Sequence, residues 1–299
     1  MSVRLHLVDG TYELFRAHYS PRPGHTSPMG QDVKATVGVV SSLLYLLHDT
    51  SEDVTHIAVA FDNPIRSFRN DLYPFYKSDE GVPPELRAQL DAAEDATRAL
   101  GVTVWSMRDL EADDALAAGA RRFRDVAEQV RIVTPDKDLA QALDGRRVVM
   151  VDRVRRREID EETLAARRGI RPRSVPDWLA LVGDAADGIP GLPGFGVRTA
   201  TRLLATHVHL EMIPDHPAAW PAAIRHAPQL ARTLEAEREA VVLYRRLATL
   251  VTDAPIAESV EDLRWRGIPR ARFERWCAAL GARALVETLE AWDARWADE

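Results

Sequence analysis

Leu5-His6-Leu7-Val8-Asp9 is the stretch that decides the fold, a short run of mostly apolar residues that ends in an aspartate. The same pattern returns twice, at Ile57-Ala58-Val59-Ala60-Phe61-Asp62 and at Ile132-Val133-Thr134-Pro135-Asp136. Short apolar runs rich in β-branched residues are typical of strands that are buried on both faces of a sheet. We therefore interpret all three runs as central strands, each with an acid at its carboxyl end.

Helical patterns separate the expected strands in the first half of the chain. We expect strands over residues 3–9, 56–62, 102–107, 130–136 and 148–152, and helices over 34–48, 84–99 and 112–125. This alternation predicts an α/β fold, a largely parallel central sheet with helices on both faces. Strand patterns fade from about residue 174, and helices are expected over 174–183, 196–207, 229–250, 269–279 and 281–296. We predict an α/β core at 1–173 and a helical region at 174–299.

Nine carboxylates share one expected location, the edge at which the parallel strands end. Three of them end strands, three begin the helix expected at 112–125, one follows a strand-end aspartate by two residues, and two stand three apart before a glycine-rich turn. They are Asp9, Asp62, Glu111, Asp113, Asp114, Asp136, Asp138, Asp184 and Asp187. Because the carboxyl ends of parallel strands meet at one edge of a sheet, where ligands bind, we expect these acids to converge.

A cluster of so many acids needs a cation. A single aspartate at a strand end or helix start is usually a turn former or a helix cap. Nine acids at one edge would repel one another, by about 4 kcal/mol for a pair ~4 Å apart at an effective dielectric near 20, unless protons or cations neutralise them. Oxygen ligands without a His or Cys cluster favour Mg²⁺ or Mn²⁺ over zinc, and nine carboxylates suit two ions.

Charge and composition indicate a nucleic-acid partner and argue against a membrane. The formal net charge of the 299 residues is −7, and it becomes +2 without the nine acids. Residues 121–173 alone carry 15 Arg or Lys against 10 Asp or Glu. No apolar run approaches the length of a membrane span, and the amino terminus has no signal-peptide pattern, so we expect a cytoplasmic protein. The single cysteine, Cys277, excludes an internal disulfide and is expected to be buried and inert.

Seven motifs follow one another in order along residues 3 to 205. They are Leu7-Val8-Asp9-Gly10, Phe61-Asp62, Phe68-Arg69, Tyr76-Lys77, Glu111-Ala112-Asp113-Asp114, Asp136-Lys137-Asp138-Leu139-Ala140-Gln141, and Gly183-Asp184 followed by Ile189-Pro190-Gly191-Leu192-Pro193-Gly194-Phe195-Gly196. In this order they resemble the 5′-nuclease family, which includes flap endonucleases and the N-terminal 5′→3′ exonuclease domain of bacterial DNA polymerase I. The resemblance implies a PIN-like nuclease core in a stand-alone nuclease.

The resemblance also implies an activity and its metal ligands. The expected activity is metal-dependent hydrolysis of phosphodiester bonds at 5′ ends, nicks or 5′ flaps of duplex DNA, including RNA-primed strands, by in-line attack of water between two ions. By position in the motifs, the first ion would be held by Asp9, Asp62, Glu111 and Asp113. The second would be held by Asp114, Asp136, Asp138, Asp184 and Asp187.

Residues 66–95 match the segment that forms an arch or clamp over the active site in similar proteins. The resemblance implies that Lys77 contacts the scissile phosphate, with Arg69 as a second catalytic cation and Tyr76 beside the DNA. The alternative for Lys77 is a solvated surface charge. The sequence departs from the family at Glu80, where many members carry an arginine that steers the 5′ strand.

A helix-hairpin-helix element is expected at about residues 178–206. Its glycines, Gly191, Gly194 and Gly196, would let backbone amides approach a phosphate, and the next helix would present its amino end with Arg198 and Thr199. By itself, a glycine-proline turn before a helix is more often a plain connection. The resemblance implies that this element grips duplex DNA without reading bases, and that its carbonyls can hold K⁺.

Two alternatives remain open. A PIN-type ribonuclease shares the acidic core but normally lacks the hairpin and is much shorter. A non-catalytic protein that binds branched DNA would keep the acids only as structure, and the full carboxylate set disfavours it. We expect a monomer, and nothing in the sequence ranks exonuclease against flap endonuclease activity.

Overall fold

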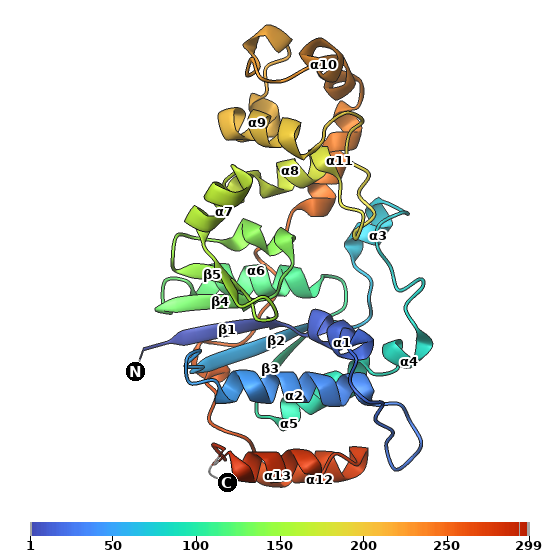
Figure 1. The fold of residues 1–299 in the computed structure, drawn as a ribbon, viewed down its shortest axis with the longest axis vertical. Coiled ribbons are helices and arrows are strands. Elements are labelled where there is room, and N and C mark those ends of the chain that lie inside the picture. The colour runs from blue at the N-terminus through green and yellow to red at the C-terminus, as the bar shows by residue number, and fades with distance from the viewer. Residues whose placement is uncertain (1, 293, 298–299) are drawn as a thin grey trace.

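Six strands form one sheet in the computed structural model, which describes residues 2–292 and 294–297. The strands are β1 (Arg4–Asp9), β2 (His56–Asp62), β3 (Thr103–Met107), β4 (Gln129–Val133), β5 (Val148–Asp152) and β6 (Arg157–Ile159). Their order is β3-β2-β1-β4-β5-β6, and every neighbouring pair is parallel except β5 and β6 (Figure 1). The predicted parallel sheet is confirmed, and the sequence missed only its short antiparallel edge strand.

Strand β1 lies at the centre of the sheet, between β2 and β4. Its register pairs Asp9 with Ala60 of β2 and Val8 with Val133 of β4. The three strands therefore end level with one another, so that Asp9, Asp62 and the residues after Val133 lie along one edge. Strand order reverses at β1, which makes this edge the place where ligands bind in open α/β sheets.

Side chains alternate along the strands and pack into two separate apolar layers, one on each face of the sheet. Leu5 and Leu7 pack with α6 (Ala112–Phe123) on one face, whereas Val8 packs with three helices on the other. These three are α1 (Gly10–Tyr19), α2 (Lys34–His48) and α5 (Leu90–Ala99). Figure 1 shows α6 on one side of the sheet and α2 and α5 on the other. Burial on both faces explains why the strands read as continuous apolar runs.

Between β1 and β3 the helices differ from expectation at three places. Asp9 caps α1, a helix that the sequence analysis did not expect. The helix expected over 84–99 is interrupted, because α4 (Pro84–Arg87) and α5 are separate. The side-chain oxygen of Gln89, at this break, accepts hydrogen bonds from the backbone and hydroxyl of Thr36. One turn of helix, α3 (Phe68–Leu72), lies in the connection from β2 to α4.

A stack of helices follows the sheet. It contains α7 (Glu161–Arg168), α8 (Val175–Val182), α9 (Val197–His207), α10 (Ala227–Ala236) and α11 (Arg238–Ala248). Figure 1 shows these helices rising from the sheet as an elongated second part. The single helix expected over 229–250 is two helices, because the chain leaves helical geometry at Glu237. After Ile159 the described residues form no further strand, so the predicted helical character of this part is confirmed.

The chain then returns to the α/β core. Helices α12 (Arg270–Leu280) and α13 (Ala284–Ala291) contribute Phe273, Cys277 and Leu289 to the apolar layer formed with α2 and α5. Cys277 is fully buried, as predicted, and burial raises the pKa of its thiol to about 12. No helix within the described ranges is both long and apolar enough to cross a membrane.

Candidate metal centre

The ends of β1 and β2 place the first two carboxylates. Asp9 Oδ1 accepts a hydrogen bond of 2.8 Å from the backbone amide of Tyr12, and its Oδ2 accepts one of 2.9 Å from the Thr134 hydroxyl. Asp62 Oδ1 accepts one of 2.8 Å from the backbone amide of Ala112. These bonds fix both side chains at the first turns of helices, where the amide groups favour negative charge.

Burial and neighbouring acids raise the pKa of several carboxyl groups at this edge. The pKa of Asp9 is raised to about 7, chiefly by burial, with Asp62 and Asp136 as neighbouring charges. Burial also raises the pKa of Asp113 well above its ordinary value, and Asp136 and Asp9 add to the effect. The pKa of Asp62 is raised by burial as well. A cation bound at this edge would favour the ionised carboxylates and so displace these protons.

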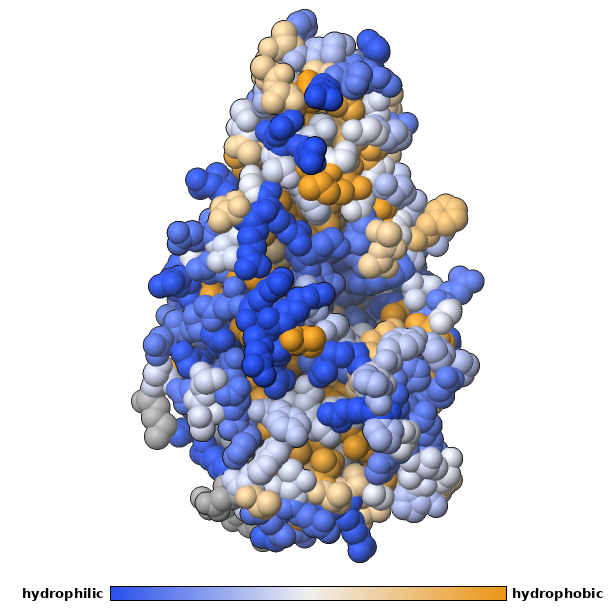
Figure 2. Space-filling view, viewed as in Figure 1, coloured by the Kyte–Doolittle hydropathy of each residue, from blue (hydrophilic) through white to orange (hydrophobic). Residues whose placement is uncertain are grey.

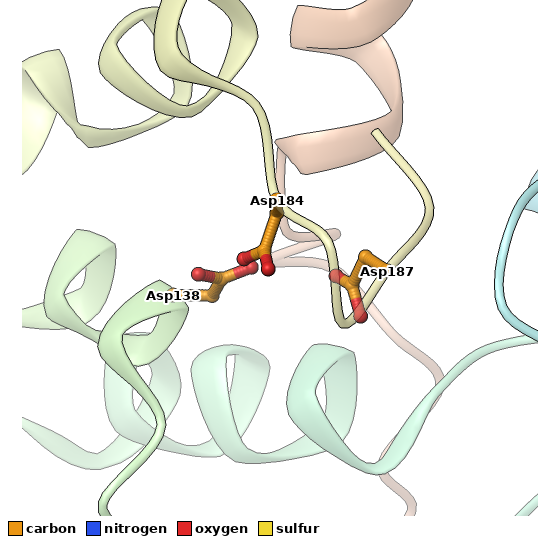
Figure 3. Close-up of side chains that lie close together, drawn as sticks. All are labelled: Asp138, Asp184 and Asp187. Atoms are coloured by element: carbon orange, nitrogen blue, oxygen red, sulfur yellow. The ribbon is translucent and has the colours of Figure 1, made fainter. Parts of the chain in front are cut away.

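Three further carboxylates, Asp138, Asp184 and Asp187, lie close together (Figure 3). Asp138 follows β4, and Asp184 and Asp187 lie in the loop after α8. One carboxylate oxygen of each residue lies within 4.8 Å of an oxygen of each of the other two. Asp138 Oδ1 is buried and has no hydrogen-bond partner among the described residues. Three convergent carboxylates fit a hard divalent cation.

Two glycines shape the loop that carries Asp184 and Asp187. Gly183 and Gly191 have φ values of +86° and +71°, which favour glycine. A Cβ on Gly183 would lie 2.7 Å from the carbonyl oxygen of Ile189, and one on Gly191 would lie 2.5 Å from the amide nitrogen of Gly183. Asp184 and Ile189 exchange backbone hydrogen bonds of 2.7 and 2.8 Å, which close the loop. Backbone packing thus holds the loop that carries these two acids.

Two lysines lie among the carboxylates. Lys77 Nζ is 3.0 Å from Glu111 Oε2 and 3.0 Å from Asp187 Oδ1, so it bridges the two groups. Burial lowers the pKa of Lys77, but Glu111, Tyr76 and Asp187 outweigh it and hold the pKa well above its ordinary value. Lys137 forms an ion pair with Asp184. No role for Lys137 was predicted from the sequence, although this lysine stands between two expected metal ligands, Asp136 and Asp138.

Tyr76 and Ser67 orient Glu111. The Tyr76 hydroxyl donates to Glu111 Oε2 at 3.2 Å, and the Ser67 hydroxyl donates to Glu111 Oε1 at 2.7 Å. Burial alone would raise the pKa of Glu111, but Lys77 and nearby donors lower it. Tyr76 is 4% exposed, and its hydroxyl lies within the carboxylate network. The DNA contact expected of Tyr76 stays a prediction.

Asp114 and Arg69 face each other, and Arg69 Nη1 also lies 3.4 Å from Glu111 Oε1. Two hydrogen bonds of 2.8 and 2.7 Å join the Arg69 guanidinium to the two Asp114 oxygens. Asp114 also accepts from the backbone amides of Glu111 and Val251 at 3.0 and 2.8 Å. Arg69 is 1% exposed and donates to the carbonyl of Leu247. Both side chains are therefore buried with several partners each, and the expected metal role of Asp114 and catalytic role of Arg69 stay predictions.

The expected DNA contacts after α8 separate into two sets. Gly194, Arg198 and Thr199 line a cleft of about 550 Å³ between α9 and the start of α10. Gly196 is exposed at the amino end of α9. Gly191 is buried against the end of α8 and does not line this cleft. The cleft is also lined by Arg202, Arg225 and His226, which the sequence analysis did not single out.

The fold and the carboxylates define the chain as a PIN-like α/β protein with a candidate metal centre and a helical second part. Two family models match it. One is the 5′-3′ exonuclease N-terminal resolvase-like domain, over residues 4–169, and the other is the 5′-3′ exonuclease C-terminal SAM fold, over residues 170–271. The chain belongs to the 5′-3′ exonuclease family, and the resemblance stated from the motifs is confirmed.

Known proteins agree with this assignment. The chain is 33% identical over 290 residues to DNA polymerase I of Mycobacterium bovis, in a match that covers 95% of this chain and 31% of that protein. It thus spans about a third of the length of the curated relatives it matches.

Solved structures share the fold. T5 5′-exonuclease with bound zinc matches with a TM-score of 0.65 and 18% identity, over 95% of this chain and 98% of that one. The catalytic core of Rad2 in complex with DNA substrate matches with a TM-score of 0.63 and 11% identity, over 98% of this chain and 92% of that one.

Proposed function

We propose that the chain hydrolyses phosphodiester bonds in the 5′-terminated strand of duplex DNA, at 5′ ends, nicks or 5′ flaps, with two divalent cations, Mg²⁺ or Mn²⁺. One observation carries the proposal: two groups of buried carboxylates at the carboxyl edge of the sheet, bridged by Lys77. Family membership supports it, as do the metal ions of T5 5′-exonuclease and the DNA substrate of Rad2. The cytoplasmic location and the monomeric state stay predictions.

The residues that would hold the ions divide into two sets. Asp9, Asp62, Glu111 and Asp113 would hold the first ion, and Asp136, Asp138, Asp184 and Asp187 the second. Cations bound there would lower the pKa of a water molecule and stabilise the attacking and leaving oxygens. Asp138 Oδ1 is buried without a hydrogen bond, and its nearest cation is Lys137 Nζ at 3.6 Å, so a bound ion would supply the ligand contact that it lacks.

Lys77 would act on the scissile phosphate. Its Nζ lies between Glu111 and Asp187, at the boundary of the two carboxylate sets, and its side chain is 31% exposed. A phosphate held against both sets would meet this ammonium group directly. A fixed positive charge at that point stabilises the negative charge that develops on the phosphate oxygens.

Arg69 and Asp114 would serve as positioning residues. Their paired hydrogen bonds tie α6 to the segment after α11, because Arg69 also donates to the carbonyl of Thr249 at 3.0 Å. Asp114 in turn accepts from the amide of Glu111, the residue that begins α6. Through this bond the pair would hold Glu111 at the metal centre without touching the substrate.

The cleft between α9 and α10 would hold the duplex. Arg198 and Thr199 lie in the first turn of α9, where backbone amides and the helix dipole favour a phosphate. Contacts of this kind give salt-dependent affinity without base readout. The helix-hairpin-helix assignment for 178–206, the arch assignment for 66–95 and a K⁺ at the hairpin carbonyls stay predictions.

The test is digestion of end-labelled DNA with product lengths resolved. Flap, nick, gap and RNA-primed duplexes are incubated with Mg²⁺, with Mn²⁺ and with excess EDTA. We expect metal-dependent cleavage near the 5′ end or the flap junction and no cleavage in EDTA. Undiminished cleavage after complete chelation would contradict the proposal. Preference for single-stranded RNA would favour a ribonuclease, and tight binding of flaps without cleavage would favour a non-catalytic DNA-binding protein.

A further inference from the structure

Three aromatic side chains from two distant segments form one cluster beside the metal centre. The ring centroids of Tyr73 and Phe75 are 5.5 Å apart, and those of Tyr73 and Tyr244 are 6.1 Å apart, in edge-to-face arrangements. Tyr73 and Phe75 precede Lys77, whereas Tyr244 belongs to α11. We call these three residues the aromatic platform.

The outermost ring of the aromatic platform faces solvent. Phe75 is 76% exposed, while Tyr73 and Tyr244 are half-buried. A single exposed phenylalanine is common on protein surfaces and needs no explanation. Here the exposed ring packs edge-to-face on Tyr73, which in turn packs on Tyr244, and aromatic rings present apolar surface at little cost in side-chain entropy.

Backbone contacts fix the platform against the loop that carries Asp187. The backbone amide of Lys77 donates to the Asp187 carbonyl at 3.0 Å. Gly188, at φ +73°, lets the chain come so close that a Cβ there would lie 2.1 Å from the Phe75 carbonyl oxygen. Because Phe75 precedes Lys77 by two residues, their Cα atoms are separated by at most about 7 Å. The platform therefore has a fixed position beside the metal centre.

The surroundings leave room for a strand to pass. Figure 1 shows α3 and α11 together above the carboxyl edge of the sheet, with the chain from α3 to α4 running along that edge. Figure 2 shows a hollow on this side, between the helical part and the core. A nucleic-acid strand with one phosphate at the carboxylates would carry its neighbouring nucleotides past the platform.

We propose that the aromatic platform stacks against an unpaired nucleobase of the strand that is cleaved, with Phe75 as the contacting ring. This inference rests on the proposed function. Base stacking on an aromatic side chain does not depend on which base is present, because every base has a π face. The platform would therefore make the centre favour 5′ strands with unpaired bases, such as flaps, without adding sequence preference.

The test compares flaps with and without bases in equilibrium binding. The probes are one duplex with a short thymidine 5′ flap, the same duplex with an abasic flap, and the blunt duplex, all measured in EDTA. The wild-type protein should bind the thymidine flap about 5- to 150-fold more tightly than the abasic flap for one stacked base. In Phe75→Ala this ratio should fall towards one, while affinity for the blunt duplex stays unchanged. Phe75→Trp should keep the ratio.

Two controls keep the outcome decisive. Tyr45→Ala removes an aromatic residue that is 57% exposed in the last turn of α2, at the opposite edge of the sheet, and should keep the wild-type ratio. Tyr244→Ala, which removes support at the edge of the platform, should lower the ratio in part. An unchanged ratio in Phe75→Ala, or a wild-type ratio of one, would overturn the proposal. A wild-type ratio of one would mean that the rings do not stack on a base, and it would favour contact with a protein partner instead.

Binding in EDTA also separates this inference from the proposed function. If the protein cleaves no DNA in Mg²⁺ but shows the base-dependent ratio, then the proposed activity fails and the platform stands. If it cleaves flaps but Phe75→Ala keeps the wild-type ratio, then the platform fails and the activity stands.

Discussion

Replacement of Asp138 by asparagine should stabilise the metal-free protein while it abolishes cleavage. The nearest oxygens of Asp138, Asp184 and Asp187 lie within 4.8 Å of one another. At that separation and an effective dielectric near 20, two unit charges repel by about 3.5 kcal/mol. Lys137 and Lys77 offset part of the charge on Asp184 and Asp187, so we expect a gain of about 1–2 kcal/mol in the free energy of unfolding.

The effect should depend on pH in a defined direction. Burial, with Asp136 and Asp187, raises the pKa of Asp138 well above its ordinary value of 3.8. The folded protein therefore holds a proton that the unfolded chain has lost, and stability falls as pH rises between the unfolded and the folded pKa. Asp138→Asn removes the titrating carboxyl group, so the variant does not lose stability in this way as pH rises. The difference between variant and wild type should be near zero below pH 3.8 and should grow as pH rises towards the folded pKa.

Urea unfolding in EDTA and in Mg²⁺ measures both halves of the prediction. Mg²⁺ at a hundred times its dissociation constant should stabilise the wild type by about 2.7 kcal/mol and the variant by much less. Asp215→Asn is the control, because that side chain is 93% exposed and its ion pair with Arg238 lies at the surface, where such pairs contribute little to stability. A variant less stable than wild type in EDTA, or one that cleaves DNA normally, would refute the reasoning.

Three further predictions follow from the same contacts. Lys77→Ala should lower the single-turnover cleavage rate by about 10²–10³-fold, with little change in DNA affinity at fixed salt. Normal cleavage by this variant at saturating enzyme would show that Lys77 is only a solvated surface charge. Arg69→Ala should reduce the free energy of unfolding by about 3–5 kcal/mol, since it leaves Asp114 buried without its partner, and urea unfolding that shows a loss below 1 kcal/mol would refute this. Glu52→Gln should cost about 1–3 kcal/mol at pH 7, because a hydrogen bond from His6 is the largest of the effects that lower the pKa of Glu52 from 4.5 to about 2. That stabilisation is lost as pH falls from 4.5 to about 2, so an unfolding difference that persisted at pH 2 would count against the assignment.

The sheet was predictable because burial on both faces leaves a simple signal. Five of its six strands read as apolar runs, whereas β6 is short and carries exposed Arg157 and Glu158. Helix α1 was missed because Asp9-Gly10 reads as a turn, although Asp9 in fact caps the helix. The helix breaks at Gln89 and Glu237 fall in segments whose helical spacing of apolar residues continues across the break. Tertiary contacts, and not the local sequence pattern, set the positions of these breaks.

The site was predictable where topology alone gathers the residues. Strand-end acids must meet at one edge of a parallel sheet, which placed Asp9 and Asp62 correctly. The pairing of Arg69 with Asp114 lay beyond reach, because the two residues are 45 positions apart and only the packed structure brings them together. For the same reason the position of Lys77 between both carboxylate groups could not be read from its motif.

The most direct test of the account is to locate the ions themselves. Crystals soaked in Mn²⁺ should show two anomalous-scattering peaks about 3.5–4 Å apart at the carboxyl edge of the sheet. One peak should lie against Asp62 and Asp113 and the other against Asp138 and Asp184. Peaks absent from both groups, or a single peak elsewhere on the surface, would contradict the claim that these carboxylates form a two-ion centre.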